Sequence, residues 1–178
     1  MDKQEYTRIV ELYYDDIKRV AFAGCKNIHD AEDIAQAVFL KLLKHTGEFE
    51  NYDHLKKWLI RVTVNECKSL WRSPWKTKVD YFVPERAVGN SGKDREKIEV
   101  MNAVLSLKQK YRGIVHLFYY EEYSAKEISE ILGVSEGTVF KRLQRAREQI
   151  KEYISKNTGD SSKETTENEE TLSWKTTL

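Results

Sequence analysis

Histidine and cysteine are the side chains that most often supply nucleophiles, general bases and metal ligands, and in this 178-residue chain they are scattered. None of the four histidines has the helical i, i+4 spacing of a zinc site, and none lies beside a pair of cysteines. The residues concerned are His29, His45, His54, His116, Cys25 and Cys67. We expect surface or helix-capping histidines and two half-buried thiols without a role, as in a reducing cytosol.

A short stretch with two glycines, residues 89–94, is the other segment that could hold a ligand. It reads Gly-Asn-Ser-Gly-Lys-Asp. A phosphate-binding loop needs a longer spacing between its glycines and a Ser or Thr where Asp94 stands, so we interpret the stretch as linker. The sequence therefore predicts no catalytic site, no metal and no cofactor.

Cations and tryptophans alternate between residues 54 and 78. Seven Lys or Arg against one Glu give this segment a net charge of 7 − 1 = +6, and Trp58, Trp71 and Trp75 are interleaved with the cations. Basic side chains bind phosphates and aromatic faces stack on unpaired bases, so the composition is typical of a single-strand binding surface. The alternative is a solvated basic face over buried tryptophans, and the helical phase of Trp58 favours burial for that one.

The sharpest pattern is a predicted helix-turn-helix. Ser124 and Glu127 have the spacing of a capping box, and Gly133 stands where a short helix would end in a left-handed residue. A second helix begins after Ser135, and five cations against two acids give residues 136–151 a net charge of 5 − 2 = +3. A basic outward face on the second helix is typical of DNA reading in the major groove; a plain helical hairpin with a charged face is the alternative.

The whole-chain charge of +1, which by itself argues against a nucleic-acid binder, is a cancellation. Residues 1–50 carry 7 − 10 = −3 and residues 156–178 carry 3 − 5 = −2, against the +6 and +3 of the two basic segments. Basic charge is therefore concentrated in the two segments that could bind nucleic acid.

Helices must position these segments, because the chain holds only 8 Gly and 2 Pro. Apolar residues at helical spacing predict further helices at about 6–21, 31–44, 54–72, 95–107 and 108–122. Both prolines fall in one stretch, which predicts a linker, and the Thr-, Ser- and Glu-rich end predicts a disordered tail. No apolar run suits a transmembrane helix or a signal peptide. The predicted fold is all-α, with two small helical domains joined by a flexible linker: domain 1–73, linker 74–94, domain 95–155 and tail 156–178.

The predicted helix over 31–44 has two faces. Projected at 100° per residue, its apolar side chains form a broad face toward a core. A second stripe mixes an acid, an amide, a lysine and an outward leucine: Asp33, Gln36, Ala37, Leu40 and Lys44. A solvated surface explains this stripe, and a surface that binds a partner is the alternative, since an exposed apolar residue among polar ones suits docking.

Three segments resemble bacterial sigma-70-type factors, in the order of that family. Residues 30–41 (DAEDIAQAVFLK) resemble the helix of region 2 that binds core RNA polymerase, and residues 58–65 (WLIRVTVN) resemble the promoter-melting segment that follows it. Residues 123–128 (YSAKEI) through 137–147 (GTVFKRLQRAR) resemble region 4, which reads the −35 element. The resemblance covers roughly residues 3–155. Because so short a linker leaves no room for a region 3 domain, the chain is similar to the extracytoplasmic-function group.

The resemblance implies three sets of site residues. The −10 element would be contacted by Arg61, Asn65, Lys68, Trp71 and Arg72, with Asn65 at the position that captures a flipped base. The −35 element would be contacted by Phe140, Lys141, Arg142, Gln144, Arg145 and Arg147. The polymerase clamp helices would bind Asp33, Gln36, Ala37, Leu40 and Lys44. Ala37 departs from the family, which usually has Glu at that position.

The resulting prediction is a sigma factor that gives core RNA polymerase its promoter specificity and performs no chemistry of its own. The implied partners are promoter DNA, the clamp helices and flap of core polymerase, and an anti-sigma factor. The chain itself is not expected to insert into a membrane. The implied location is the bacterial cytoplasm, at the nucleoid when in holoenzyme. A stand-alone helix-turn-helix regulator is the first alternative, but it leaves the basic aromatic segment unexplained. A helical adaptor that binds only protein is the second alternative, and it should show no salt-dependent DNA binding.

Overall fold

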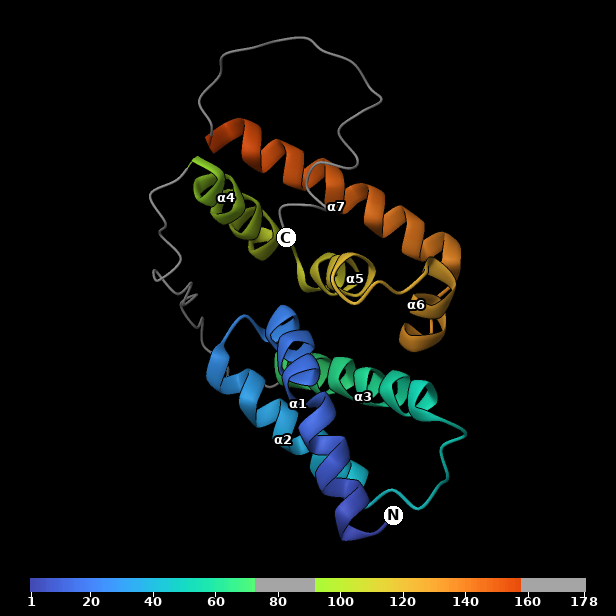
Figure 1. The fold of residues 1–178 in the computed structure, drawn as a ribbon. Coiled ribbons are helices and arrows are strands. Elements are labelled where there is room, and N and C mark those ends of the chain that lie inside the picture. The colour runs from blue at the N-terminus through green and yellow to red at the C-terminus, as the bar shows by residue number, and fades with distance from the viewer. Residues whose placement is uncertain (73–91, 158–178) are drawn as a thin grey trace.

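A computed structural model describes residues 1–72 and 92–157 of the chain. This part contains seven helices and no strand, which confirms the predicted all-α fold (Figure 1). The N-terminal bundle consists of α1 (Lys3–Cys25), α2 (Ile28–Leu43) and α3 (Tyr52–Arg72). The C-terminal bundle consists of α4 (Gly92–Ser106), α5 (Gln109–Tyr119), α6 (Ala125–Leu132) and α7 (Glu136–Asn157). Trp75, nearly all of the predicted linker and all but the first two residues of the predicted tail lie outside the described residues.

Polar caps set the ends of the first two helices. The Asp2 carboxylate accepts the backbone N–H of Glu5 at 2.8 Å, and Asn27 accepts the backbone N–H groups of His29 and Asp30. These bonds satisfy amides that have no partner inside the helix. The apolar face predicted for α2 is buried, as expected, through Ile34, Ala35, Val38, Phe39 and Leu42.

Helix α1 passes close to α3 at Gly24. A Cβ atom placed on Gly24 would overlap the Cys67 sulfur, so only glycine lets the two helices pack at this distance. The Cys67 thiol points to the carbonyl oxygen of Ala21 at 3.7 Å. Burial raises the pKa of Cys67 to about 12, which keeps this thiol protonated.

The C-terminal bundle has a small apolar cluster of its own and also completes the main one. Val104, Leu107, Tyr111, Val115 and Ala146 pack together between α4, α5 and α7. The main cluster joins both bundles, because residues of α5, α6 and α7 pack with those of α1, α2 and α3. In Figure 1, α5 lies above α1, and α6 lies near α3. The two bundles therefore share one apolar core, an arrangement that the local sequence patterns do not predict.

Candidate nucleic-acid interface

The predicted helix-turn-helix is formed by α6 and α7. The Ser124 hydroxyl accepts the backbone N–H of Glu127 at 3.3 Å, and the Glu127 carboxylate accepts that of Ser124 at 3.0 Å, which completes the capping box. Gly133 ends α6 with a φ of 65°, a left-handed conformation that favours glycine. The Ser135 hydroxyl then accepts the backbone N–H of Thr138 at 3.2 Å, at the start of α7. These local bonds fix the turn and therefore the direction of α7.

One face of α7 is buried and the opposite face is open. Val139, Leu143 and Ala146 are buried, as their spacing predicts. The exposed face carries four of the six residues that the resemblance assigns to the −35 element: Phe140, Lys141, Gln144 and Arg145. Of these, Arg145 also hydrogen-bonds the Tyr111 side chain of α5. Phe140 is 56% exposed and adds an apolar ring to this face. The face is basic, with an amide and an aromatic ring between its cations, and side chains of these types can contact base edges in a major groove.

The other two predicted −35 residues point elsewhere. Arg147 donates a hydrogen bond to the Tyr119 hydroxyl at 2.7 Å and stacks over that ring, 5.8 Å from its centre. Arg142 is half-buried and lines a cavity of about 250 Å³ between the two bundles. Lys68 of α3 lines the same cavity. In this conformation Arg142 is therefore not on the exposed face of α7.

Four predicted −10 residues share a stripe of α3. Arg61, Asn65, Lys68 and Arg72 fall within about 60° when projected at 100° per residue. Asn65 and Arg72 are exposed and Lys68 is half-buried. Arg61 is also exposed, but its guanidinium donates to backbone carbonyls of α6. The stripe thus runs along the edge where α3 meets the C-terminal bundle.

The two described tryptophans of the basic segment have different surroundings. Trp58 is half-buried against the main core, as its phase predicts, with its ring centre 4.8 Å from that of His45 and 5.6 Å from that of Phe49. Trp71 is 49% exposed and donates a hydrogen bond to the carbonyl of Gly24 at 3.1 Å. Trp71 therefore offers a partly open aromatic face beside the α3 stripe.

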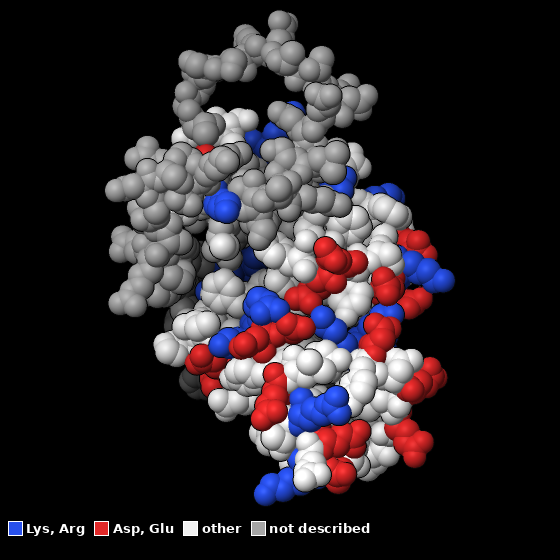
Figure 2. Space-filling model, in the orientation of Figure 1, with Lys and Arg blue, Asp and Glu red and all other residues white. Residues whose placement is uncertain are grey.

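The predicted polymerase-binding stripe lies on the outside of α2. Asp33, Gln36 and Lys44 are exposed, and Leu40 is 55% exposed. Ala37 is half-buried. Leu43, which the residue pattern did not predict at this surface, is 57% exposed and widens its apolar part. Figure 2 shows acidic and basic side chains intermixed over the visible face of the N-terminal bundle.

Charged side chains form a network at the junction of the bundles, which no motif in the sequence predicts. Lys56 of α3 lies 3.0 Å from Asp16 and 3.2 Å from Glu121, which follows α5. Burial acts to lower the pKa of Lys56, but its hydrogen bonds to the two carboxylates outweigh this and raise it. Burial likewise acts to raise the pKa of Glu121, but the neighbouring His116 imidazole and Lys56 ammonium hold it below its usual value.

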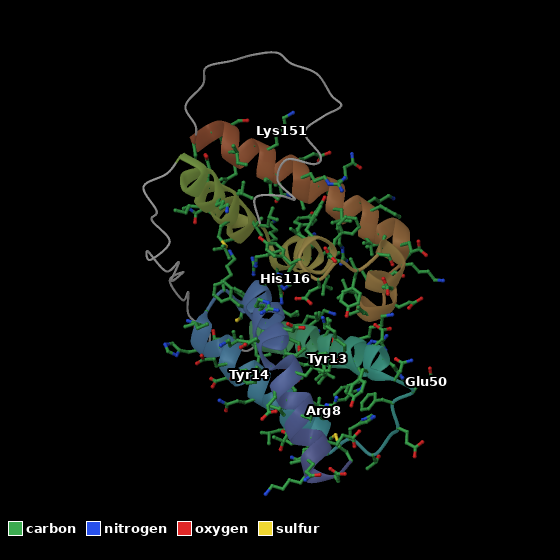
Figure 3. All side chains as sticks on the ribbon, viewed as in Figure 1. Arg8, Tyr13, Tyr14, Glu50, His116 and Lys151 are labelled. Carbon is green, nitrogen blue, oxygen red and sulfur yellow. The ribbon has the colours of Figure 1, made fainter. Side chains whose placement is uncertain are left out.

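The prediction of a surface or capping role is wrong for His116. Its side chain is buried at the level where the bundles meet (Figure 3), because α5 packs against the N-terminal bundle. The imidazole stacks on Tyr120 with ring centres 5.1 Å apart, and its Nε2 lies 3.5 Å from a Glu121 oxygen. No spacing in the sequence signals this position.

The structure does not bring together a metal site among the residues it describes. In 1–72 and 92–157, no three His, Cys, Asp or Glu side chains gather closely enough to hold an ion. Across the same ranges, no helix has the length and apolar character needed to cross a membrane.

Comparison with known proteins matches both bundles to one family. The model of Sigma-70 region 2 matches residues 9–77, and that of Sigma-70 region 4 matches residues 97–150. The ECF RNA polymerase sigma factor SigW of Bacillus subtilis is 29% identical over 172 residues, which cover 86% of this chain and 90% of SigW. SigM of the same organism is 30% identical over 160 residues, which cover 85% of this chain and 96% of SigM.

Two solved structures share the fold. The sigma factor RpoE of Bartonella quintana, in complex with the anti-sigma factor NepR, superposes with a TM-score of 0.67 at 19% identity. The match covers 86% of this chain and 99% of RpoE. CnrH, in complex with the cytosolic domain of CnrY, gives a TM-score of 0.65 at 18% identity over 88% of this chain and 91% of CnrH.

Proposed function

Because the chain belongs to the sigma-70 family, in the extracytoplasmic-function group of RNA polymerase sigma factors, it directs promoter-specific transcription initiation, and we propose which surface does each part of that work. Residues 1–73 act as region 2, which binds core polymerase and melts and reads the −10 element. Residues 95–155 act as region 4, which reads the −35 element. Residues 74–94 connect them.

The exposed face of α7 is the −35 reader. The observation that carries this assignment is the set of Phe140, Lys141, Gln144 and Arg145 on one open face, opposite the buried Val139, Leu143 and Ala146. Arginine and glutamine are suited to read guanine and adenine edges in the major groove, and lysine to bind phosphate. Arg142 and Arg147 join this surface only after leaving the cavity and Tyr119.

The α3 stripe is the −10 reader. Arg61, Lys68 and Arg72 would follow the phosphates of the unwound strand, and Trp71 would stack on an unpaired base. Asn65, between these cations, would hydrogen-bond the edge of a flipped base. Separation of the strands would then be driven by stacking and phosphate contacts, without a chemical step.

The outer stripe of α2 is the surface for the polymerase clamp helices. An exposed Leu40 ringed by Asp33, Gln36 and Lys44 has the apolar centre and polar rim of a protein interface. Region 4 would also contact the polymerase flap. RpoE and CnrH are each solved with a partner, an anti-sigma factor in the case of RpoE, which supports an anti-sigma partner for this chain as well. The protein would act in the cytoplasm, at the nucleoid when in holoenzyme, and is not an enzyme.

Run-off transcription tests the function directly. Core RNA polymerase is assayed with and without the full chain over a promoter library. We expect transcripts from a subset of promoters that share one −35 and one −10 sequence, and only when the chain is added. A transcript pattern unchanged by the chain would refute the function.

A substitution tests the −10 assignment. Asn65→Ala should reduce discrimination at one −10 position by about 1–3 kcal/mol, because an exposed amide that reads a base edge is lost. Binding to core polymerase should not change, since Asn65 lies on α3 and the proposed clamp surface lies on α2. Transcription over −10 variants and a core-binding titration measure the two effects. A loss of core binding would contradict the assignment.

A further inference from the structure

A partly enclosed cavity lies beside His116, where helices of the two bundles meet (Figure 3). It measures about 250 Å³ and is walled by α1, α3, α5, the end of α6 and α7. Most of its wall is aliphatic, from side chains such as Val20, Val64, Ile114 and Leu132. Small-molecule sites have this character, an apolar wall with a few placed polar groups. The proposed contacts with DNA and polymerase do not use this space.

Positive charge is concentrated on the wall of the cavity. Lys68 of α3, Lys110 of α5 and Arg142 of α7 line it, and none of the lining residues that the structure describes is Asp or Glu. Lys68 and Arg142 are half-buried, and within residues 1–72 and 92–157 neither has a carboxylate partner. Each has lost part of its hydration without gaining a counter-ion, and a concave wall of one sign attracts the opposite charge. A ligand of this cavity should therefore be an anion.

The volume and the wall narrow the choice of anion. A cavity of about 150 Å³ holds a benzene-sized molecule of about six heavy atoms, so one of about 250 Å³ suits roughly ten. Phe, Tyr and Trp are absent from the described part of the lining, so a nucleobase would find no ring to stack on. An aliphatic chain, by contrast, gains from burial against the valine, isoleucine and leucine side chains. A straight eight-carbon carboxylate meets both requirements.

Gly113 of α5 shows that this wall has room for more atoms. A Cβ atom placed on Gly113 would meet no heavy atom within 4 Å. Because Gly113 also lines the cavity, a larger side chain at this position has space to enter it without displacing packed residues. The position therefore offers a way to fill the cavity while the surrounding helices keep their packing.

We propose that this cavity binds a medium-chain aliphatic carboxylate, with the chain against the aliphatic wall and the head group between Lys68 and Arg142. One consequence rests on the proposed function, which assigns the same two cations to promoter DNA. A carboxylate paired with them competes with DNA for their charge. Occupation of the cavity should therefore weaken promoter binding.

Calorimetric titration of the full chain with sodium octanoate tests the site. We expect saturation at one molecule per chain, with a Kd below about 1 mM for a ligand of roughly ten heavy atoms. Acetate has the charged head without the chain, and octanol has the chain without the charge. Each should bind at least about tenfold more weakly than octanoate, because each loses one of the two contributions.

Two pairs of variants locate the binding. Gly113→Leu fills the cavity and should weaken octanoate binding at least about tenfold. Gly137→Leu is its control, because it also adds a side chain to a helical glycine with open space around the Cβ position but lies outside the lining. Lys68→Met should weaken octanoate binding about tenfold and leave octanol binding unchanged. Lys108→Met, which removes an exposed cation outside the lining, should change neither.

Three results would overturn the proposal: no saturable binding of one molecule per chain, octanol binding as tightly as octanoate, or equal octanoate affinities of Gly113→Leu and Gly137→Leu. Lys68→Met keeps the test decisive should Gly113→Leu fail to fold, since an affinity equal to that of Lys108→Met would exclude the head-group contact.

Run-off transcription tests the consequence separately from binding. Octanoate near its Kd should reduce promoter-specific transcripts of the unchanged chain but not those of Gly113→Leu. Unchanged transcription at saturating octanoate would refute the competition with DNA. If octanoate binds as expected to a chain that directs no promoter-specific transcript, the site stands and the proposed function fails. A transcribing chain that binds no octanoate refutes the site alone.

Discussion

Replacing Glu127 with glutamine tests how far the helix-turn-helix depends on a single charge. The carboxylate accepts the Ser124 hydroxyl at 2.7 Å and the Ser124 backbone N–H at 3.0 Å, and it pairs with Lys57 at 3.0 Å. Hydrogen bonds from Ser124, and then the Lys57 cation, lower the pKa of Glu127 from 4.5 to about 2. At about 1.4 kcal/mol per pKa unit this corresponds to about 3.4 kcal/mol. Since the side chain is 35% exposed, solvent screening reduces the expected value to about 1–1.5 kcal/mol.

The sign of the pH dependence follows from the lowered pKa. Above pH 4.5 the carboxylate is charged in both the folded and the unfolded chain, and its stabilising contribution is fully present. As the pH falls from 4.5 toward 2, the unfolded chain takes up the proton first and the contribution is lost. Glutamine also occurs at this position of capping boxes, so Glu127→Gln removes the charge while its amide oxygen still accepts the Ser124 N–H.

Urea titrations of the full chain measure the effect. At pH 7 the free energy of unfolding of Glu127→Gln should be about 1–1.5 kcal/mol below that of the unchanged chain, and the difference should narrow below pH 4.5. Glu152→Gln is the control, because Glu152 pairs with Lys156 on the exposed surface of α7 and its loss should have no measurable effect. A difference that stays constant below pH 4.5, or equal stabilities of Glu127→Gln and the control at pH 7, would refute the reasoning.

Three further substitutions probe the −35 face, the α2 stripe and the contact between α1 and α3. Arg145→Ala should cost about 1–3 kcal/mol in promoter binding and relax selectivity at one −35 position, measured with holoenzyme on a promoter library; a uniform loss would identify a phosphate contact instead. Leu40→Asp should weaken core polymerase binding by roughly tenfold or more. Leu12→Asp on α1 is the control and should not weaken it, because Leu12 is 56% exposed and Leu40 55%. Equal losses would exclude the α2 stripe as the clamp surface. Gly24→Ala should lower the free energy of unfolding by about 1–3 kcal/mol, because the added methyl group overlaps Cys67. In the same urea titration, adding Cys67→Ala should restore part of this loss. Strictly additive losses would place the strain elsewhere.

Local spacing predicted the features that depend on neighbours in the sequence. The capping box of Ser124 and Glu127, the left-handed Gly133 and the buried faces of α2 and α7 all form as expected, because each depends on residues at most a few turns apart. Helix ends shifted by a few residues; for example, α5 ends at Tyr119 instead of about residue 122. The outward positions of Leu40 and Arg145 followed from the same projection.

The junction between the bundles could not be predicted in this way. The contacts of Arg112 with α1 join residues 88 and 89 positions apart, and those of Arg61 with α6 span 69 and 70. The sequence does not distinguish a buried arginine from an exposed one, because the difference depends on which other helices pack against it. His116 was misplaced for this reason, and Arg61 was expected to face DNA while its present partners are carbonyls of α6. Contact between helices that are distant in the sequence depends on the shapes of both folded bundles, and local residue spacing does not predict these shapes.

Much of the positive charge of the basic segment is already neutralised within the fold. Lys56 and Lys57 are paired with carboxylates and Arg61 is bound to α6, so three of the seven cations in this segment already have partners. Counterion release on DNA depends on cations that reach phosphates, so with these three cations paired the salt dependence of DNA binding should be shallower than the net charge of the segment implies. The acids that bring the whole chain to +1 include Asp16, Glu121 and Glu127, which neutralise these cations in place. Net charge summed over a segment therefore overstates the number of its cations that can reach promoter phosphates.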